Sequence, residues 1–225
     1  MKKSSTEMVL KLPSHEGKKS TGRIRRRNEE LIINAAKHEF ALKGYDGATI
    51  GSIAKRAGLP RPNIHYYYDS KLALYGDILS GIVDLWDDAL NDLEASDEPA
   101  TALSEYIQQK LSFSRRYPLD SRIFAKEILS GAPRLETYFA RGYRLWFERK
   151  LRVFQDWADR GKMDRVDPAH LMFLIWSSTQ HYADFEAQIG AALGVSSLGE
   201  GEFDAAAKTL VMVILKGVGL SNCEE

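Results

Sequence analysis

The segment 49–68 constrains the fold most, because it predicts two short helices with almost no room between them. Thr49 is a favourable N-cap for a helix over IGSIAKRA, and Gly58 suits the left-handed conformation that ends such a helix. Pro60 then favours the start of a second helix, since proline is tolerated in the first turn of a helix. The second helix, Arg61–Tyr67, is about two turns long and has little stability alone. Two short helices joined by a tight glycine-containing turn predict a helix-turn-helix.

Elsewhere in the chain, apolar residues recur at a spacing of three or four, which is typical of amphipathic helices. No stretch alternates apolar and polar residues for long enough to predict a strand. We therefore expect an all-α fold of about nine helices, at residues 25–43, 50–57, 61–67, 71–93, 100–116, 120–130, 133–161, 167–190 and 202–219.

Charge divides the chain, although 31 Lys and Arg balance 31 Asp and Glu overall. Residues 1–75 hold 15 basic and 7 acidic residues, a net charge of +8, and the rest of the chain carries −8. This asymmetry is typical of a nucleic-acid-binding end joined to a module that does not touch nucleic acid. We expect a flexible basic arm at 1–22, the helix-turn-helix domain at 23–70 and a second helical domain at 71–225.

Other features of the composition exclude several classes of protein. The single cysteine, Cys223, has no disulfide partner and favours a cytoplasmic location. No apolar run is long enough to span a bilayer, and the N-terminus lacks the apolar stretch of a secretory signal. Common catalytic motifs are missing, and His181 and Asp184 lack a third partner for a metal. We expect no enzyme, no metal or cofactor site and no membrane association.

The second helix of the motif offers side chains suited to reading base edges. In a major groove, Arg61 can bind guanine, Asn63 adenine, and His65 either a base or a phosphate. Residues beside this helix are placed for the phosphate backbone. We expect double-stranded DNA to contact Arg25, Arg26, Thr49, Arg61, Pro62, Asn63, His65, Tyr66, Tyr67 and Lys71.

Residues 35–75, AAKHEFALKGYDGATIGSIAKRAGLPRPNIHYYYDSKLALY, resemble the DNA-binding domain of the TetR family of transcriptional regulators. The shared pattern is Gly-Tyr, then Thr, then I-A-x-x-A-G-L, and a Tyr-rich ending with S-K-x-x-L-Y. Pro60 and Pro62 depart from it, because they fix the backbone at the start of the recognition helix and remove a hydroxyl that could reach a phosphate. The resemblance implies a homodimer that binds a palindromic operator.

The basic residues before the first expected helix allow two interpretations. They can enter the adjacent minor groove or bind phosphates, or they can be a solvated run that only aids solubility. We favour DNA contact because the arm leads directly into the predicted DNA-binding domain. The residues concerned are Lys18, Lys19, Arg23, Arg25, Arg26 and Arg27.

The second half of the chain resembles one subgroup of the same family, the pyrimidine-utilisation regulators. The resemblance covers most of residues 100–195 and is sharpest in IWSSTQHYADF, residues 175–185. It implies that the domain at 71–225 senses a uracil-type base and dimerises. We therefore expect a ligand-responsive regulator, a repressor, whose effector is uracil, thymine or a related catabolite.

A helix carrying this string places Trp176, Gln180 and Asp184 on one side, at i, i+4 and i+8. An aromatic plane can stack on a nucleobase, and an amide offers both a donor and an acceptor. Trp86 can close the pocket from the DNA-binding side. We expect the effector to contact Trp86, Phe124, Trp176, Thr179, Gln180 and Asp184.

Several alternatives stay open. A tryptophan in a helical bundle is often a core residue, and Gln180 can instead be satisfied across a dimer interface. Arg122 and Glu127 can form a buried ion pair or line the pocket. The same fold can sense a purine or another small molecule, can act as an adaptor without a ligand, or, remotely, can be a helical enzyme. The apolar segments 171–175 and 203–220 predict the dimer surface.

Overall fold

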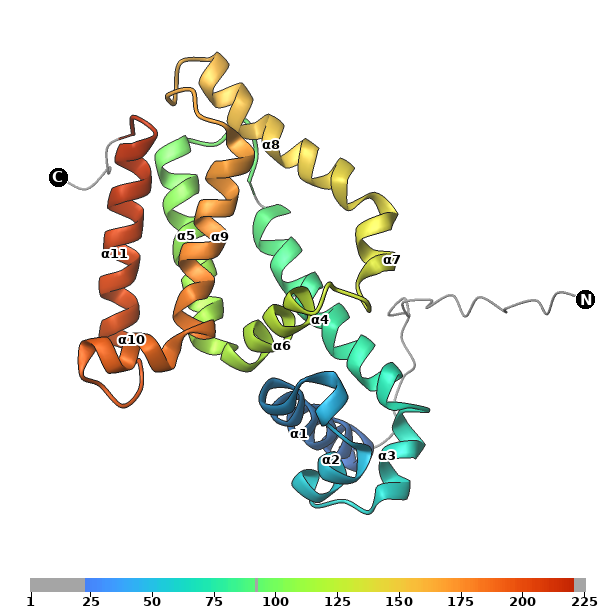
Figure 1. Cartoon of the computed structure of the whole chain (residues 1–225). Coiled ribbons are helices and arrows are strands. Elements are labelled where there is room, and N and C mark those ends of the chain that lie inside the picture. Colours follow the sequence, from blue (N-terminus) through green and yellow to red (C-terminus); the bar gives the residue numbers. More distant parts are fainter. Residues whose placement is uncertain (1–22, 92, 221–225) are drawn as a thin grey trace, which may run out of the picture.

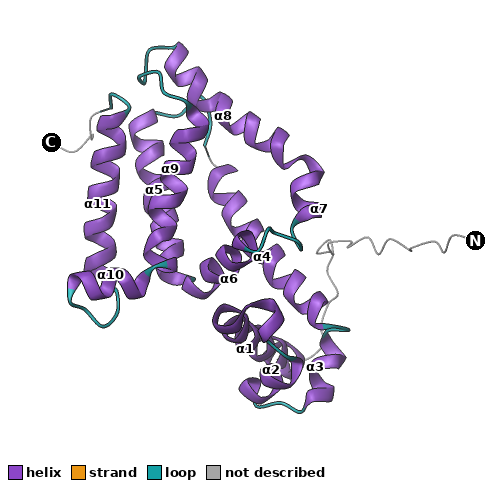
Figure 2. Ribbon diagram, viewed as in Figure 1, coloured by secondary structure: helices purple, strands orange, loops and turns teal. Residues whose placement is uncertain are grey.

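The computed structural model describes residues 23–91 and 93–220, and every regular element among them is a helix (Figures 1 and 2). The expected all-α class is therefore confirmed. The arm predicted at 1–22 lies outside the described residues. The elements are α1 (Arg23–Gly47), α2 (Ile50–Ala57), α3 (Arg61–Tyr67), α4 (Lys71–Asn91), α5 (Pro99–Arg116), α6 (Pro118–Leu129), α7 (Glu136–Tyr138), the π-helical turn η1 (Phe139–Tyr143), α8 (Arg144–Asp159), α9 (Pro168–Asp184), α10 (Glu186–Leu193) and α11 (Glu200–Gly217).

The described part contains eleven α-helices rather than the expected nine, because two long segments are interrupted. The segment 133–161 is divided at η1, where Gly142 adopts φ +96°, a conformation that a regular helix does not contain. The segment 167–190 is divided at Phe185, which ends α9. Its backbone N–H donates to the carbonyl of His181 at 2.9 Å. The first helix also begins at Arg23, two residues before its expected start.

The helix-turn-helix follows the predicted boundaries closely. Thr49 caps α2 by accepting a hydrogen bond from the N–H of Ser52 at 3.0 Å. Gly58 ends α2 in the left-handed conformation, with φ +67°. Ser70 accepts from the N–H of Ala73 at 3.1 Å at the start of α4. The predicted caps of α2 at Thr49 and Gly58 are confirmed.

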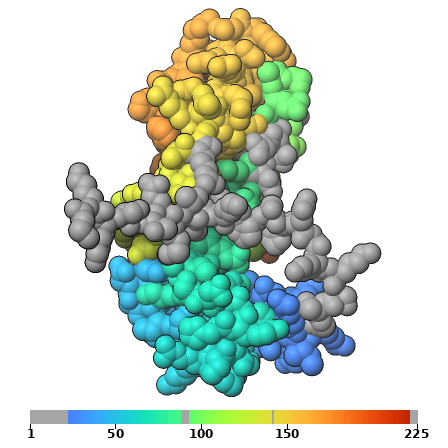
Figure 3. All heavy atoms as spheres, turned by 90° about the vertical axis from the view of Figure 1, so that its right-hand side faces the viewer, coloured from blue at the N-terminus to red at the C-terminus, as the bar shows by residue number. Residues whose placement is uncertain are grey.

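Two hydrophobic cores hold the chain together. One core joins α1, α2, α3 and the first half of α4, and it also takes in Ile123 of α6 and Leu135. The other core surrounds the fully buried Trp157 and joins α5, α8, α9 and α11. Figure 1 shows α5, α9 and α11 side by side, with α4 rising from the helix-turn-helix toward them. Figure 3 shows, on another face, α2–α4 below and α7–α8 above.

Helix α6 contributes to the first core and also contacts α5 and α9, which belong to the second core. Toward α1, the ammonium of Lys37 lies 2.8 Å from the carboxylate of Asp120. Toward α4, the hydroxyl of Tyr75 donates to buried Glu127 at 3.0 Å. Toward α9, Ser121 donates to Asp184 at 2.7 Å. Any displacement of α6 therefore changes contacts in both halves of the molecule.

Arg122 and Glu127 do not pair with one another. Arg122 donates to the carbonyl of Ala183 at 3.0 Å and pairs with Glu186. Glu127 instead binds Arg134, through the backbone N–H at 2.8 Å and the guanidinium at 3.3 Å. The two residues are five positions apart, so their side chains point to different sides of α6 and meet different partners.

No helix within residues 23–91 and 93–220 has the length and apolarity needed to cross a membrane. In the same residues, no three His, Cys, Asp or Glu side chains gather where they could hold a metal ion.

Candidate DNA-reading surface and effector cavity

Helix α3 is anchored through one side and exposed on the other. Ile64 is completely buried, and Tyr68 directly after the helix donates to Asp77 at 3.2 Å. Those two contacts hold a seven-residue helix that would not be stable alone. The predicted DNA-reading residues occupy its open side: Arg61, Pro62, His65 and Tyr66 are exposed, and Asn63 and Tyr67 are half-buried.

The start of α1 lies beside this surface. Tyr66 is 71% exposed, and the guanidinium of Arg25 lies 5.8 Å from the centroid of its ring. Arg26 is exposed and pairs with Glu30 of the same helix at 3.2 Å. The structure therefore brings Arg25 of α1 and the recognition helix together, and their contact with DNA stays a prediction.

Lys71 lies mainly inside the domain. Its ammonium donates to the backbone carbonyls of Tyr45 at 2.7 Å and Ala48 at 3.0 Å, and it lies 4.2 Å from the Tyr45 ring centroid. These bonds tie the end of α1 to the start of α4. Two of the three N–H groups of the ammonium are therefore already used. The predicted contact of Lys71 with a DNA phosphate requires the third.

A second feature is a cavity of about 230 Å³ lined by residues of α4, α5, α6, α7, η1, α8 and α9. This volume lies below the range of about 300 to 1,000 Å³ that is typical of drug-sized ligands. Four of the six residues predicted to bind the effector line it: Trp86, Phe124, Trp176 and Gln180. The structure thus brings together side chains from α4, α6 and α9 that lie far apart in the sequence.

Aromatic contacts shape the walls of this cavity. The Trp86 and Phe124 rings meet edge to face, with centroids 4.5 Å apart. On α9, the indole N–H of Trp176 donates to the hydroxyl of Tyr106 at 2.7 Å. Because this bond satisfies its only polar atom, Trp176 can offer its ring surface to a planar ligand.

Thr179 and Asp184 do not line the cavity. Thr179 is completely buried in the core and donates to the carbonyl of Ile175 at 2.7 Å. Asp184 faces α6, and burial raises the pKa of its carboxyl group. A step of four residues turns a helix by about 400°, so positions i and i+8 already differ by about 80° in direction. This drift carries Asp184 away from the side that Trp176 and Gln180 share.

Three polar residues at the cavity were not predicted. Lys110 of α5 is only 4% exposed, and burial lowers its pKa to about 8. Tyr138 donates to the carboxylate of Asp87 at 3.1 Å. The sequence does contain a signal for Lys110. Leu103, Ile107 and Lys110 are spaced by four and then three residues, so all three lie on the buried face of α5. A charge on such a face is rare unless it has a function or a partner.

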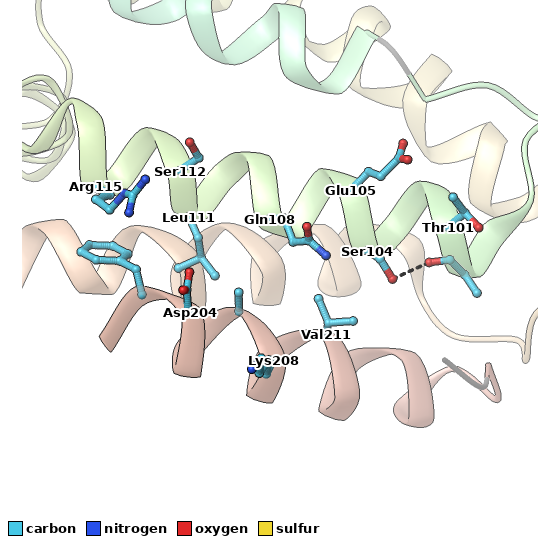
Figure 4. Close-up of a pocket in the computed structure, with 13 residues that line it drawn as sticks. Thr101, Ser104, Glu105, Gln108, Leu111, Ser112, Arg115, Asp204, Lys208 and Val211 are labelled. Atoms are coloured by element: carbon cyan, nitrogen blue, oxygen red, sulfur yellow. Dashed lines mark hydrogen bonds between the residues drawn. The ribbon is translucent and has the colours of Figure 1, made fainter. Parts of the chain in front are cut away.

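A larger hollow of about 550 Å³ lies between α5 and α11 (Figure 4). It is an open groove whose labelled side chains include Glu105, Gln108 and Lys208. None of the residues predicted to bind the effector lines it. Eight of its thirteen lining residues are polar or charged and one, Phe203, is aromatic, so it lacks the stacking surfaces of the cavity at Trp86.

Comparison with known proteins assigns the chain to a family. A family model described as "Bacterial regulatory proteins, tetR family" matches residues 32–78, and one described as "YcdC-like protein, C-terminal region" matches residues 79–221. The HTH-type transcriptional regulator RutR of Escherichia coli K12 is 36% identical over 203 residues, 89% of this chain and 96% of RutR. The negative transcriptional regulator IcaR of the biofilm operon icaADBC, from Staphylococcus aureus strain Newman, is 38% identical over 47 residues, 21% of this chain and 25% of IcaR.

Solved structures share the fold. A TetR-like transcriptional regulator from Rhodococcus sp. RHA1 has a TM-score of 0.61 at 19% identity, over 84% of this chain and 94% of that one. A mutant of HlyIIR has a TM-score of 0.60 at 22% identity, over 86% and 98% of the two chains. The matched families and relatives are transcriptional regulators rather than enzymes, as expected. The chain belongs to the TetR family of DNA-binding transcriptional regulators.

Proposed function

We propose that this protein is a cytoplasmic, ligand-responsive repressor whose effector is a pyrimidine base, uracil or thymine, or a related catabolite. The observation that carries the proposal is the single cavity at which Trp86, Trp176 and Gln180 meet. The string at residues 175–185, which resembles the pyrimidine-utilisation regulators, supplies two of these three residues. The 36% identity to RutR extends over 89% of the chain, so it includes the domain that contains the cavity.

The size and walls of the cavity favour a single planar ring. A volume of about 230 Å³ suits a small ligand better than an amphipathic drug. Aromatic side chains from α4, α6, α8 and α9 provide stacking surfaces. Gln180 can pair with a ring edge that has a donor beside an acceptor, as the edge of uracil does.

DNA binding follows from the exposed side of α3 within a domain that we place at residues 23–70. A homodimer presents two copies of α3, which can enter successive major grooves of a palindromic operator about 34 Å apart. Helices α9 and α11 carry the exposed apolar residues that suit such a dimer. Phe173, Leu174, Met212 and Val213 are 42–55% exposed. Effector binding in the domain at 71–225 then changes the separation of the two recognition helices.

Isothermal titration calorimetry and thermal unfolding test the effector class. The ligands are uracil, thymine, dihydrouracil, adenine and guanine, and the proteins are wild type, Trp176→Ala, Gln180→Ala and the control Gln108→Ala. Gln108 is exposed in the groove between α5 and α11, away from the cavity. A ligand at about 100 times its Kd stabilises the folded state by about 2.7 kcal/mol.

Stabilisation by uracil or thymine in wild type and Gln108→Ala, lost in the two cavity variants, is the expected result. Binding of adenine or guanine in place of the pyrimidines would contradict the pyrimidine assignment and favour a purine sensor of the same fold. If no base binds, the effector belongs to another chemical class, and the role of α3 in DNA binding is unaffected.

A further inference from the structure

Lys110 is the most unusual polar group of the cavity. Its side chain leaves α5 among buried residues and ends at the cavity wall, where only 4% of the residue is exposed. Within the described part of the chain, its ammonium takes part in no hydrogen bond and no ion pair. The ammonium lies over the face of Trp86, 4.6 Å from the ring centroid.

A buried ammonium in this state lacks an acceptor. A desolvated cation is stabilised over the face of an indole ring, but the ring accepts no conventional hydrogen bond. Three N–H donors are therefore available at the cavity, and leaving a buried donor unpaired costs free energy. A ligand oxygen in the cavity would remove this cost.

The surrounding charges determine which kind of oxygen fits. Asp87 on α4 and Asp184 on α9 both interact favourably with the ammonium over a longer distance. Each of these carboxylates is already hydrogen-bonded, Asp87 by Tyr138 and Asp184 by Ser121. Two carboxylates therefore already lie near the positive charge, while the need for a hydrogen-bond acceptor remains. A neutral carbonyl oxygen meets that need, whereas an anionic ligand would add a negative charge beside two acidic groups.

We propose that Lys110 Nζ donates a hydrogen bond to a ring carbonyl of the effector and thereby restricts effectors to neutral cyclic lactams and imides. The inference rests on the proposed function only in that it places the effector in the cavity between Trp86 and Trp176. Stacking walls alone would accept any small aromatic ring. A buried donor rejects rings that lack an acceptor, because binding them would leave the ammonium unpaired.

Calorimetry with matched proteins and matched ligands tests this contact. The proteins are wild type, Lys110→Met and the control Lys162→Met, in which the replaced lysine is exposed after α8. The ligands are uracil, 2-thiouracil and 4-thiouracil, in which sulfur, a weaker acceptor, replaces one carbonyl oxygen at a time. Hydrogen bonds to charged groups contribute enough for an expected loss of about tenfold or more in uracil affinity in Lys110→Met.

The pairing of variant and ligand identifies the bond itself. One of the two thio compounds should bind wild type and Lys162→Met much more weakly than uracil does. In Lys110→Met the same compound should bind about as well as uracil, because the interacting group is already gone. Uracil affinity in Lys110→Met within about twofold of wild type would overturn the proposal.

Two further probes separate this inference from the pyrimidine assignment. Succinimide and hydantoin are cyclic imides without a pyrimidine ring. If pyrimidines fail to bind wild type while either imide binds in a Lys110-dependent manner, the pyrimidine assignment fails and the role of Lys110 stands. If no lactam or imide binds, both fail. The melting temperature of ligand-free Lys110→Met, expected at or above that of wild type, shows that the variant folds.

Discussion

At the scale of single residues, Lys110 links stability to pH. Burial lowers its pKa from about 10.5 to about 8, so between these values the unfolded chain binds more protons than the folded one. The free energy of unfolding should therefore rise with pH across this window. Each pKa unit corresponds to about 1.4 kcal/mol, so the charged form of Lys110 costs on the order of 3 kcal/mol near neutral pH.

Urea unfolding of ligand-free wild type and Lys110→Met, at about pH 7 and about pH 9.5, measures this effect. We expect the variant to be more stable at the lower pH and the difference to shrink at the higher pH, since wild-type Lys110 loses its charge there. Lys162→Met should follow wild type at both pH values. A difference that does not change with pH would mean that Lys110 is solvated and keeps its ordinary pKa.

Asn63 is the residue of α3 whose removal should relax sequence specificity. Its amide can bind adenine through two hydrogen bonds, and such a pair discriminates between bases by about 1–3 kcal/mol. Asn63→Ala should weaken binding to an operator selected from random-sequence DNA by that amount. Binding to unrelated DNA should stay the same, because it depends on phosphate contacts.

Fluorescence anisotropy with the two DNAs at one salt concentration provides the measurement. Asn34→Ala is the matched control, since Asn34 is exposed on α1 outside the recognition helix. Equal losses on both DNAs for Asn63→Ala would show that Asn63 positions the helix and does not read a base.

Individual residues also show how far the sequence could predict the site. Trp86, Phe124, Trp176 and Gln180 were predicted to meet, and the structure places all four around one cavity. Lys110 was missed because helical periodicity predicts only that its position is buried. Which cavity a buried position faces depends on how the helices cross, and no single helix encodes that packing.

At the scale of helices, the apolar outer faces of α9 and α11 should form the dimer interface. Leu174 is 52% exposed and Val213 is 55% exposed, although both lie in otherwise apolar stretches. The double variant Leu174→Glu and Val213→Glu should be monomeric, because four like charges would be buried in the interface of a symmetric dimer. Sedimentation velocity at micromolar concentration measures the change.

Leu145→Glu is the control for added charge, since Leu145 is 63% exposed on α8. Leu145→Glu should remain dimeric and keep its operator affinity. The double variant should lose much of its operator affinity, because a monomer presents one recognition helix instead of two. A double variant that stays dimeric would place the interface on another face.

Helix existence was predictable from the sequence, and helix continuity was less so. The caps at Thr49 and Gly58 bounded α2 correctly, because capping is decided by neighbouring residues. The interruptions at Gly142 and Phe185 were not predicted. Isolated glycines are tolerated within helices, and Phe185 has no property that by itself ends a helix. Tertiary packing decides such breaks.

At the scale of the whole molecule, α6 is a direct connection between the cavity and the DNA-binding domain. Phe124 and Ile128 of α6 line the cavity. Glu127, between them in the sequence, accepts from Tyr75 of α4 inside the core that holds the recognition helix. A ligand that favours one position of α6 therefore favours one position of the DNA-binding domain. It can change DNA affinity only by as much as its own affinity differs between the two states.

This coupling should be reciprocal and should depend on the bond between Tyr75 and Glu127. The factor by which uracil changes operator affinity must equal the factor by which the operator changes uracil affinity, and both can be measured by anisotropy and calorimetry.

Tyr75→Phe should fold, because Glu127 keeps its bonds to Arg134 and the lost hydrogen bond costs about 1 kcal/mol. In this variant both factors should move toward one, while uracil affinity without DNA changes little. Tyr117→Phe, at an exposed tyrosine between α5 and α6, should keep the wild-type factors. Unchanged factors in Tyr75→Phe would mean that the effector acts on the recognition helices by another route, through α4 itself.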